Sequence, residues 1–328
     1  MAEGITPSCG KLMSLDSDSK QWLQGTFGTR VLFDESMSRH TSLRVGGPAD
    51  AYVAPDSTET LLGLIDWSRQ KGIPYMVIGD GTNLLVKDSG IRGIVIVLTK
   101  CLNKITRTGN GPDQVMVTAM AGVRMNALCW FAIKNGFEGM NFALGIPGTV
   151  GGGILMNAGT GYGWVANVLN SVKVLLPTGK TQRINGDDVN FSYRKLTWDA
   201  KQIKMCQGPC IILDGCFRLR PCDPQKLKKE AVAILATRKS KQPTRYPSAG
   251  CFFKNPPSGK TAGELIELAG LKAKRIGGAV VSSKHANFII NTGTASADDV
   301  LALMEHVQKT VFKAFNINLD PEVKIVGT

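Results

Sequence analysis

The 328-residue sequence has no hydrophobic run close to the roughly 20 residues that a membrane-spanning helix needs. Its N-terminal segment has neither the apolar core of a secretory signal peptide nor the arginine-rich composition of an organelle-targeting peptide. We therefore expect a cytoplasmic protein whose eight cysteines are reduced thiols. The sequence also lacks a collagen-like period, internal repeats and low-complexity tracts, so its 37 glycines indicate many tight turns.

Cysteine pairs with the spacing of zinc ligands are missing as well. Four cysteines lie within 206–222, but three, five and five residues separate them, so no C-x-x-C pair occurs. The three histidines, which could complete such a site, lie far away in the sequence. We therefore expect no bound metal, and we interpret the four thiols as small side chains around a strand at 211–219.

Basic residues outnumber acidic residues, 39 to 26, which gives a formal net charge of +13. A charge of this size favours anionic partners such as nucleic acid, anionic lipid or phosphorylated small molecules. The sequence has no block of Lys and Arg interleaved with aromatic residues, so we expect no nucleic-acid binding. A basic enzyme that acts on phosphorylated molecules agrees with the same charge.

Hydrophobic periodicity predicts alternating strands and helices, and therefore a mixed α+β protein. We expect a helix that begins with a capping box at Asp56 and Glu59 and ends at Gly72. Ser296 and Asp299 indicate the start of a long C-terminal helix in the same way. Further helices are expected at 124–135, 226–239 and 261–269, and strands at 51–53, 74–78, 84–86, 94–98, 115–119, 171–180 (a hairpin arm), 211–220, 280–281, 288–290 and 321–326.

Two glycine-rich segments are candidates for phosphate binding. The first, 79–83 (GDGTN), lacks the third glycine and the following helix of a dinucleotide-binding fingerprint, which argues against a Rossmann fold. The second is 145–153 (GIPGTVGGG). Glycines let a ligand approach the main chain closely, and turns of this kind present backbone N–H groups to phosphates. Together the segments predict a long diphosphate ligand, although each alone could be an ordinary turn.

These two segments belong to a series of motifs that runs along most of the chain. The others are 41–49 (TSLRVGGPA), 156–159 (MNAG), 192–194 (SYR), 246–256 (YPSAGCFFKNP) and 275–278 (RIGG). In this order they resemble the UDP-N-acetylenolpyruvoylglucosamine reductase family, from about residue 39 to residue 327.

The resemblance implies an α+β fold. It contains an FAD-binding domain of the vanillyl-alcohol-oxidase (PCMH) type in two subdomains, and a C-terminal α/β substrate-binding domain. The implied boundaries are an N-terminal extension at 1–25, subdomains at 26–100 and 101–222, the substrate-binding domain at 223–318 and a final strand at 319–328. The short interval between Asn157 and Arg194 resembles the shorter, second type of the family.

The family's implied activity is the NADPH-dependent reduction of UDP-N-acetylglucosamine enolpyruvate to UDP-N-acetylmuramate, a step of peptidoglycan precursor synthesis. FAD is the implied cofactor, and NADPH and a UDP-sugar are the implied ligands. Some flavoproteins of this fold attach FAD through a histidine in the first glycine loop. Neither loop has a histidine in or beside it, so we expect noncovalent FAD. We also expect a monomer that does not insert into a membrane.

The resemblance places the catalytic roles on three residues. Cys251 matches the proton donor, a position where the family most often has serine. A thiol is the stronger acid of the two. Arg194 matches the group that pairs with the substrate carboxylate or the developing enolate, and Glu322 matches an acid that stabilises the enol. Without the family, Cys251 could be a small buried residue and Arg194 a surface arginine.

The resemblance also assigns the binding residues. Those for the UDP-sugar are Tyr193, Lys241, Asn255 and Arg275. Those for FAD are Arg44, Gly79, Asp80, Gly81, Thr82, Asn83, Gly145, Ile146, Pro147, Gly148, Thr149, Gly152, Gly153, Asn157 and Ala158. Lys324 stands where relatives often have arginine. Two other functions stay open: a flavin-dependent alcohol oxidase on the same fold, and a non-catalytic protein that binds a nucleotide sugar.

Overall fold

The structure, a computed structural model, describes residues 15–111, 113–198 and 210–328. Expectations for Cys9, Cys206 and most of the 1–25 extension lie outside these residues. The chain divides into two compact units, each assembled from separate stretches of sequence. Of the described residues, the first unit takes in those within 1–32, 51–80 and 93–236, and the second takes in those within 33–50, 81–92 and 237–328. The domain boundaries implied by the resemblance stay a prediction.

A four-stranded sheet has the order β1-β2-β5-β3, formed by β1 (Val31–Ser36), β2 (Pro48–Val53), β5 (Ile91–Val97) and β3 (Tyr75–Ile78). β3 and β5 are parallel, with Tyr75 opposite Ile94 and Ile78 opposite Val97. The predicted strands at 51–53 and 74–78 are therefore not neighbours, because β5 lies between them.

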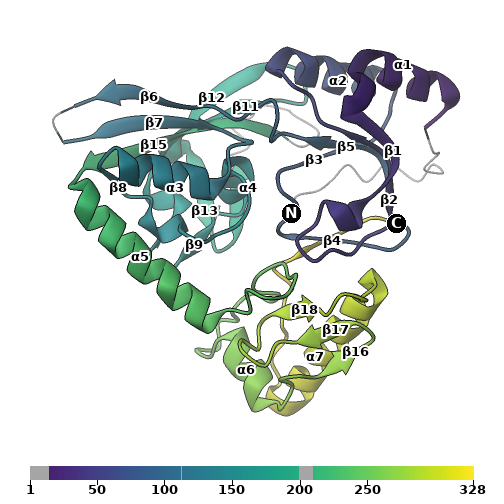
Figure 1. Ribbon diagram of the computed structural model, residues 1–328, viewed down its shortest axis with the longest axis vertical. Helices are drawn as coiled ribbons and strands as arrows, with labels where there is room; N and C mark the ends of the chain where they lie inside the picture. The colour runs from purple at the N-terminus through teal and green to yellow at the C-terminus, as the bar shows by residue number, and fades with distance from the viewer. Residues whose placement is uncertain (1–14, 112, 199–209) are drawn as a thin grey trace. The chain divides into compact units, whose positions relative to one another are not determined.

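Two helices in the first unit are joined by an aromatic stack. They are α1 (Ser17–Phe27) and α2 (Thr58–Gln70). The indole rings of Trp22 and Trp67 stack with centroids 3.9 Å apart and planes 6° apart. Leu23 and Phe27 are buried on α1, and Figure 1 shows the two helices as neighbours. The sequence pattern predicts no element before residue 50, so α1 is a helix that only the structure reveals.

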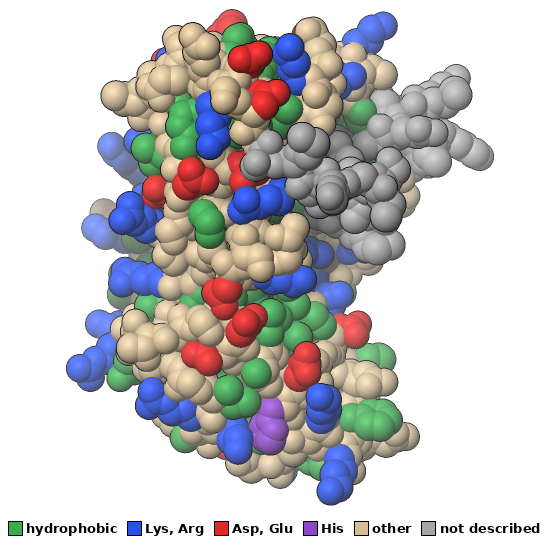
Figure 2. All heavy atoms as spheres, turned by 90° about the vertical axis from the view of Figure 1, so that its right-hand side faces the viewer, with side chains coloured by type: hydrophobic (Ala, Val, Ile, Leu, Met, Phe, Trp, Pro, Cys, Tyr) green, Lys and Arg blue, Asp and Glu red, His purple; other side chains and the backbone are tan. Residues whose placement is uncertain are grey.

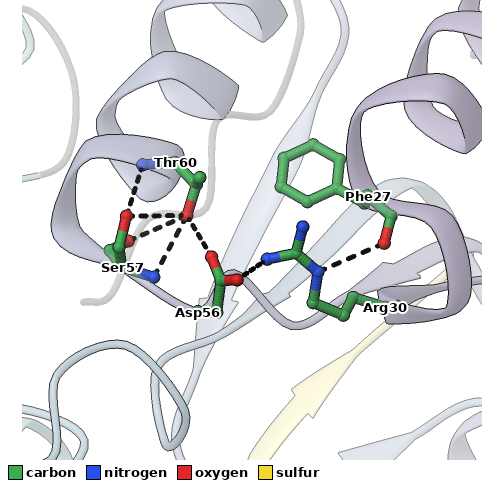
Figure 3. A network of polar contacts seen from close by, with 5 residues as sticks. All are labelled: Phe27, Arg30, Asp56, Ser57 and Thr60. Carbon is green, nitrogen blue, oxygen red and sulfur yellow. Dashed lines mark hydrogen bonds and ion pairs between the residues drawn. The ribbon is translucent and has the colours of Figure 1, made fainter.

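A polar network holds the start of α2 (Figure 3). Arg30 Nε donates to the carbonyl oxygen at the end of α1, and the same guanidinium forms an ion pair with Asp56. Ser57 Oγ accepts from the backbone N–H of Thr60 at 3.1 Å, and Ser57 N–H donates to Thr60 Oγ1 at 3.2 Å. The predicted capping box at Asp56 and Glu59 is therefore wrong by one residue. Arg30 pairs with the carboxylate of Asp56, and Ser57 serves as the N-cap.

A larger antiparallel sheet completes the first unit. Its order is β12 (Thr181–Asn185), β11 (Leu169–Leu175), β15 (Ile211–Pro221), β7 (Val115–Met120) and β6 (Ile105–Asn110), and β8 (Phe137–Glu138) also pairs with β15. α3 (Met125–Lys134) and α4 (Val150–Leu155) lie against this sheet, and α4 contacts β15 and β7 (Figure 1). Two small ladders are β9 (Gly159–Thr160) with β10 (Gly163–Trp164), and β13 (Val189–Ser192) with β14 (Lys195–Trp198). After β15 the chain enters α5 (Pro224–Lys241).

The second unit is built around α6 (Ala262–Leu268) and α7 (Ala297–Phe315). They share one apolar core with the antiparallel sheet β16 (Arg275–Ile276), β17 (Ala279–Val281) and β18 (Ile289–Asn291). The predicted capping box of α7 is confirmed, because Ser296 Oγ accepts from Asp299 N–H at 3.0 Å. The Asp88 carboxylate accepts from two further N–H groups in the first turn of α7, at 2.9 and 3.0 Å.

The unit also contains a parallel pair of strands that are distant in sequence. β4 (Leu84–Val86) pairs with β19 (Lys324–Val326) in the register Leu84 with Lys324 and Val86 with Val326. β4 follows the first glycine-rich segment directly, and β19 begins two residues after Glu322. The ladder therefore brings the predicted flavin loop and the predicted catalytic acid to one place in the fold.

Within the described ranges, no helix is both long and apolar enough to cross a membrane. On the face drawn in Figure 2, Lys and Arg side chains are spread among acidic ones and do not form a single basic block.

Candidate active site

The two glycine-rich segments meet within the first unit. A Cβ atom at Gly79 would clash with Thr149 Oγ1, so only glycine permits this approach. Thr149 forms a β-bridge with Arg124, and Arg124 Nε donates to Asp80 Oδ2 at 3.1 Å. The start of the first segment and the middle of the second are therefore neighbours. Their adjacency agrees with one extended ligand that contacts both.

The second segment is fixed to the turn between β7 and α3. Val150 N–H donates to the Val123 carbonyl oxygen at 2.8 Å, and Gly151 N–H donates to that of Ala121 at 2.9 Å. Since internal bonds use these two donors, they cannot bind a phosphate unless those bonds break. Gly145 and Gly148 have φ angles of 74° and 105°, which a side chain would disfavour.

The end of the first segment lies in the second unit. A Cβ at Gly81 would clash with the His40 carbonyl oxygen, and Gly81 accepts from Ser42 N–H at 3.2 Å. Arg44, a predicted FAD residue, follows on the same turn with a φ of 54°. Asn83 Nδ2 donates to the Glu322 carbonyl oxygen at 3.1 Å. The residues present fit a flavin dinucleotide. The glycines of both segments expose main chain to a ligand, and Arg44 supplies a cation beside the first segment.

Arg194 is held between two aromatic rings in the first unit. Its Cζ lies 5.3 Å from the Trp164 ring centroid and 5.1 Å from that of Tyr193. The two rings lie edge to face with centroids 6.0 Å apart. Arg194 Nη1 donates to the Gly159 carbonyl oxygen at 3.3 Å, and the residue has a left-handed φ of 57°. These contacts orient the guanidinium.

Two neighbours support this arrangement. Gly159 lies opposite Trp164 in the β9–β10 ladder, and a Cβ there would clash with the indole. The buried Asn157 donates from Nδ2 to the Ser192 carbonyl oxygen at 3.2 Å and accepts from Ala166 N–H at 3.1 Å. A predicted FAD residue, Asn157, is thus bonded to the hairpin that presents Arg194. Sequence reasoning missed Trp164, which belongs to no motif.

Cys251 is half-buried in the second unit, after Gly250 with its φ of 82°. The two residues that follow it, Phe252 and Phe253, are 0% and 1% exposed. The Phe252 carbonyl oxygen accepts from Glu322 N–H at 2.8 Å. Two of the predicted catalytic residues, Cys251 and Glu322, are therefore connected through one backbone hydrogen bond.

The cysteines differ in their surroundings. Burial raises the pKa of Cys101 to about 11 and that of Cys129 to about 12, so both are poor nucleophiles. Near Cys251 lies Arg238, in the last turn of α5. Burial lowers the pKa of the Arg238 guanidinium, and the charge of the Cys251 thiolate acts in the opposite direction. The Arg238 guanidinium therefore lies close enough to Cys251 for their charges to interact.

The predicted UDP-sugar residues vary in their roles within the structure. Asn255 Oδ1 accepts from Ala262 N–H at 3.0 Å and so caps the start of α6. Arg275 is exposed and donates to the Gly277 carbonyl oxygen at 2.6 Å, and Lys241 is exposed at the end of α5. Tyr193 is 41% exposed beside Arg194. No group of three or more His, Cys, Asp or Glu side chains in the described part of the chain could hold a metal ion.

The predicted site residues are distributed over both units. The first unit contains Gly79, Asp80, Gly145, Ile146, Pro147, Gly148, Thr149, Gly152, Gly153, Asn157, Ala158, Tyr193 and Arg194. The second unit contains Arg44, Gly81, Thr82, Asn83, Lys241, Cys251, Asn255, Arg275 and Glu322. Their individual roles stay predictions.

Comparisons with known proteins identify the family that shares this sequence and fold. Residues 49–185 match the model of an FAD binding domain, and residues 242–326 match the C-terminal domain of UDP-N-acetylenolpyruvoylglucosamine reductase. The chain is 46% identical over 313 residues to the UDP-N-acetylenolpyruvoylglucosamine reductase of Desulfosudis oleivorans, covering 95% of this chain and 100% of that protein. The reductase of Heliobacterium modesticaldum is 40% identical over 307 residues, covering 94% and 91% of the two chains.

A solved structure agrees with these relatives. The crystal structure of UDP-N-acetylenolpyruvylglucosamine reductase from Thermus caldophilus superposes with a TM-score of 0.71 at 32% identity. It covers 90% of this chain and 98% of that chain. The expected flavin-binding α+β fold and the FAD cofactor are confirmed by the matched FAD binding domain and these relatives. The chain belongs to the UDP-N-acetylenolpyruvoylglucosamine reductase family, the FAD-dependent oxidoreductases of peptidoglycan precursor synthesis.

Proposed function

We propose that this protein reduces UDP-N-acetylglucosamine enolpyruvate to UDP-N-acetylmuramate with NADPH, and that Cys251 is the proton donor. Arg194 and Glu322 are proposed to stabilise the charge that develops on the substrate. The observation that carries the assignment is the hydrogen bond of 2.8 Å between Glu322 N–H and the carbonyl oxygen of Phe252, the residue next to Cys251. This bond supports a site in which the acid Glu322 and the proton donor Cys251 act on the same substrate.

The reaction saturates a carbon–carbon double bond. When bound, FAD supplies the reducing equivalents that come from NADPH and end on the terminal vinyl carbon. The adjacent carbon carries negative charge, which it shares with the substrate carboxylate, and it must receive a proton. The protein therefore has to stabilise an enolate and donate one proton.

Cys251 suits the proton-donor role because its thiol is a far stronger acid than a serine hydroxyl. The thiolate that remains after the transfer is stabilised by the charge of Arg238, to which it is electrostatically coupled. A solvent proton then restores the thiol before the next turnover. Cys101 and Cys129 are unsuitable, since burial raises their pKa values to about 11 and about 12.

Arg194 suits the carboxylate because a guanidinium stays charged and can bond both oxygens. The rings of Trp164 and Tyr193 hold it without neutralising its charge. Glu322 is proposed to polarise the enolate oxygen. Lys324, two residues further on, supplies a single cation but cannot form the bidentate pair of an arginine.

The remaining assignments follow the same proposal. Arg44 and the glycine-rich segments would hold FAD, and Tyr193, Lys241, Asn255 and Arg275 would bind the UDP-sugar. The formal net charge of +13 agrees with three anionic ligands. We propose a monomer of the cytoplasm that binds no nucleic acid.

An anaerobic spectroscopic experiment tests the function. NADPH should bleach the visible flavin band of the FAD-loaded protein, and only the enolpyruvyl sugar should restore it. Bleaching without recovery would contradict the substrate assignment, and recovery with oxygen after reduction by an alcohol would favour an oxidase.

The same experiment with Cys251→Ala tests the proton donor. Reduction by NADPH should be unchanged, while reoxidation by the enolpyruvyl sugar should slow by about 100- to 10,000-fold, the contribution expected of a general acid. Cys251→Ser is the matched control and should retain substantial activity. If Cys251→Ala reoxidises at the normal rate, Cys251 is not the donor.

A further inference from the structure

We propose that Asn287 is a positioning residue for the proton donor, although it belongs to none of the predicted site residues. The inference rests on the proposed function of Cys251. Asn287 is 3% exposed and lies between β17 and β18, 36 residues after Cys251 in the sequence. It touches the loop of Cys251 through the two residues that follow the thiol.

The backbone of Phe252 and Phe253 has four polar groups, and Asn287 satisfies three of them. Phe252 N–H donates to the Asn287 carbonyl oxygen at 2.7 Å. Phe253 N–H donates to Asn287 Oδ1 at 2.9 Å, and Asn287 Nδ2 donates to the Phe253 carbonyl oxygen at 2.8 Å. One asparagine thus fixes both peptide units directly after Cys251.

The fourth group is the carbonyl oxygen of Phe252, which accepts from Glu322 N–H at 2.8 Å. The residues just before Glu322 contact the same segment: Phe253 forms a β-bridge with Pro321, and Lys254 N–H donates to the Asp320 carbonyl oxygen at 2.8 Å. The segment after Cys251 is therefore bonded to Asn287 and to the chain that carries Glu322. A shift of Phe252 would move the thiol and the acid together.

The orientation of the Asn287 amide follows from its partners. The backbone N–H of Phe253 requires an acceptor and its carbonyl oxygen requires a donor, so Oδ1 and Nδ2 have only one arrangement that satisfies both. Asn287 is itself held, because its N–H donates to His285 Nδ1 at 3.3 Å, and Phe288 N–H donates to the His285 carbonyl oxygen at 3.0 Å. The amide is a rigid support rather than a mobile side chain.

Asn287→Ala removes two of the three bonds and leaves buried backbone groups of Phe253 unpaired. We expect the oxidative half-reaction to slow by about 10- to 100-fold, the effect of a small displacement of a reacting group. The reduction of flavin by NADPH should be unchanged. The solvent deuterium isotope effect on flavin reoxidation should increase, because proton transfer becomes the slower step.

A second readout does not depend on turnover. Amide hydrogen exchange at Phe252 and Phe253 should be faster in Asn287→Ala, and the alkylation rate of Cys251 by iodoacetamide should change. Asn287→Ser is the second variant if the alanine protein does not fold. Its hydroxyl is too short to form both side-chain bonds, so the same direction of change is expected.

Leu303→Ala is the matched control, because it truncates a fully buried residue of the same core without touching these bonds. Slowing that came only from lost stability would appear in both variants and in both half-reactions. A wild-type reoxidation rate and an unchanged isotope effect in Asn287→Ala would overturn the inference. Normal reoxidation in Cys251→Ala, measured alongside, would instead overturn the proposed function.

Discussion

Arg194 and Cys251 are held in place in opposite ways. Arg194 sits on an exposed hairpin, and its guanidinium lies against the faces of Trp164 and Tyr193. Cys251 precedes two almost completely buried residues whose backbone groups are all paired. Ring faces attract a cation over a range of positions, whereas amide bonds require one geometry. The comparison predicts that the proposed anion-binding group, Arg194, can follow a substrate, while the proposed proton donor, Cys251, stays fixed.

The strongest test of this comparison removes the cation. Arg194→Met should lower kcat by about 100- to 1,000-fold, the cost typical of losing one group that stabilises an oxyanion. Steady-state kinetics with the enolpyruvyl sugar measure it. Arg194→Lys keeps the charge but loses the planar fork, so only partial recovery is expected. A loss of less than a few-fold in Arg194→Met would contradict the proposed role.

A smaller effect is expected from the aromatic support. Trp164→Ala should lower kcat by about 2- to 30-fold, since a cation–π contact contributes about 0.5 to 2 kcal/mol. Trp164→Phe keeps a ring face and should retain most of the activity. Equal losses in the two variants would show that the ring face is not the feature that matters. Thermal unfolding of both proteins should separate this effect from lost stability.

The smallest effect is expected at the buried thiols. At pH 8, a thiol with a pKa of about 11 is only about 0.1% thiolate, so Cys101 and Cys129 should resist iodoacetamide. Their raised pKa values favour the folded state below pH 9, and this contribution should decline as the pH rises toward 11 and 12. Peptide mass spectrometry before and after unfolding checks the protection. Modification of Cys129 in the folded protein would contradict it.

Cys129→Ala should leave activity unchanged at pH 8 and sharpen the comparison with Cys251. The pH dependence of its unfolding free energy above pH 9 should be weaker than in the wild type. An unchanged slope would show that another group, rather than Cys129, dominates there.

Local signals in the sequence predicted much of the fold. The capping box of Ser296 and Asp299 and the glycine after α2 each lie within a few residues of the elements that they delimit. α1 was missed because its apolar residues are few, and Trp22 gains its role only by stacking on Trp67. The cap of α2 was misplaced by one residue because the ion pair of Asp56 with Arg30 is a tertiary contact.

The residues of the candidate site also divide into those that sequence motifs indicate and those that only the structure reveals. Motifs pointed to Cys251 and the glycine-rich segments as candidates, because each lies in a recognisable run of neighbouring residues. Asn287 and Trp164 carry no motif, since one contacts its partners across 34 residues and the other across about 30. Only the folded chain places Asn287 beside the residues that follow Cys251, and Trp164 beside Arg194.

The parallel pairing of β4 with β19 also affects how the protein is made. Strands separated by about 240 residues meet in it, so the second unit cannot be completed until the ribosome has synthesised residues 324–326. Until then β4 lacks its partner strand. The synthesis of residues 324–326, and not that of either glycine-rich segment, therefore completes this part of the second unit.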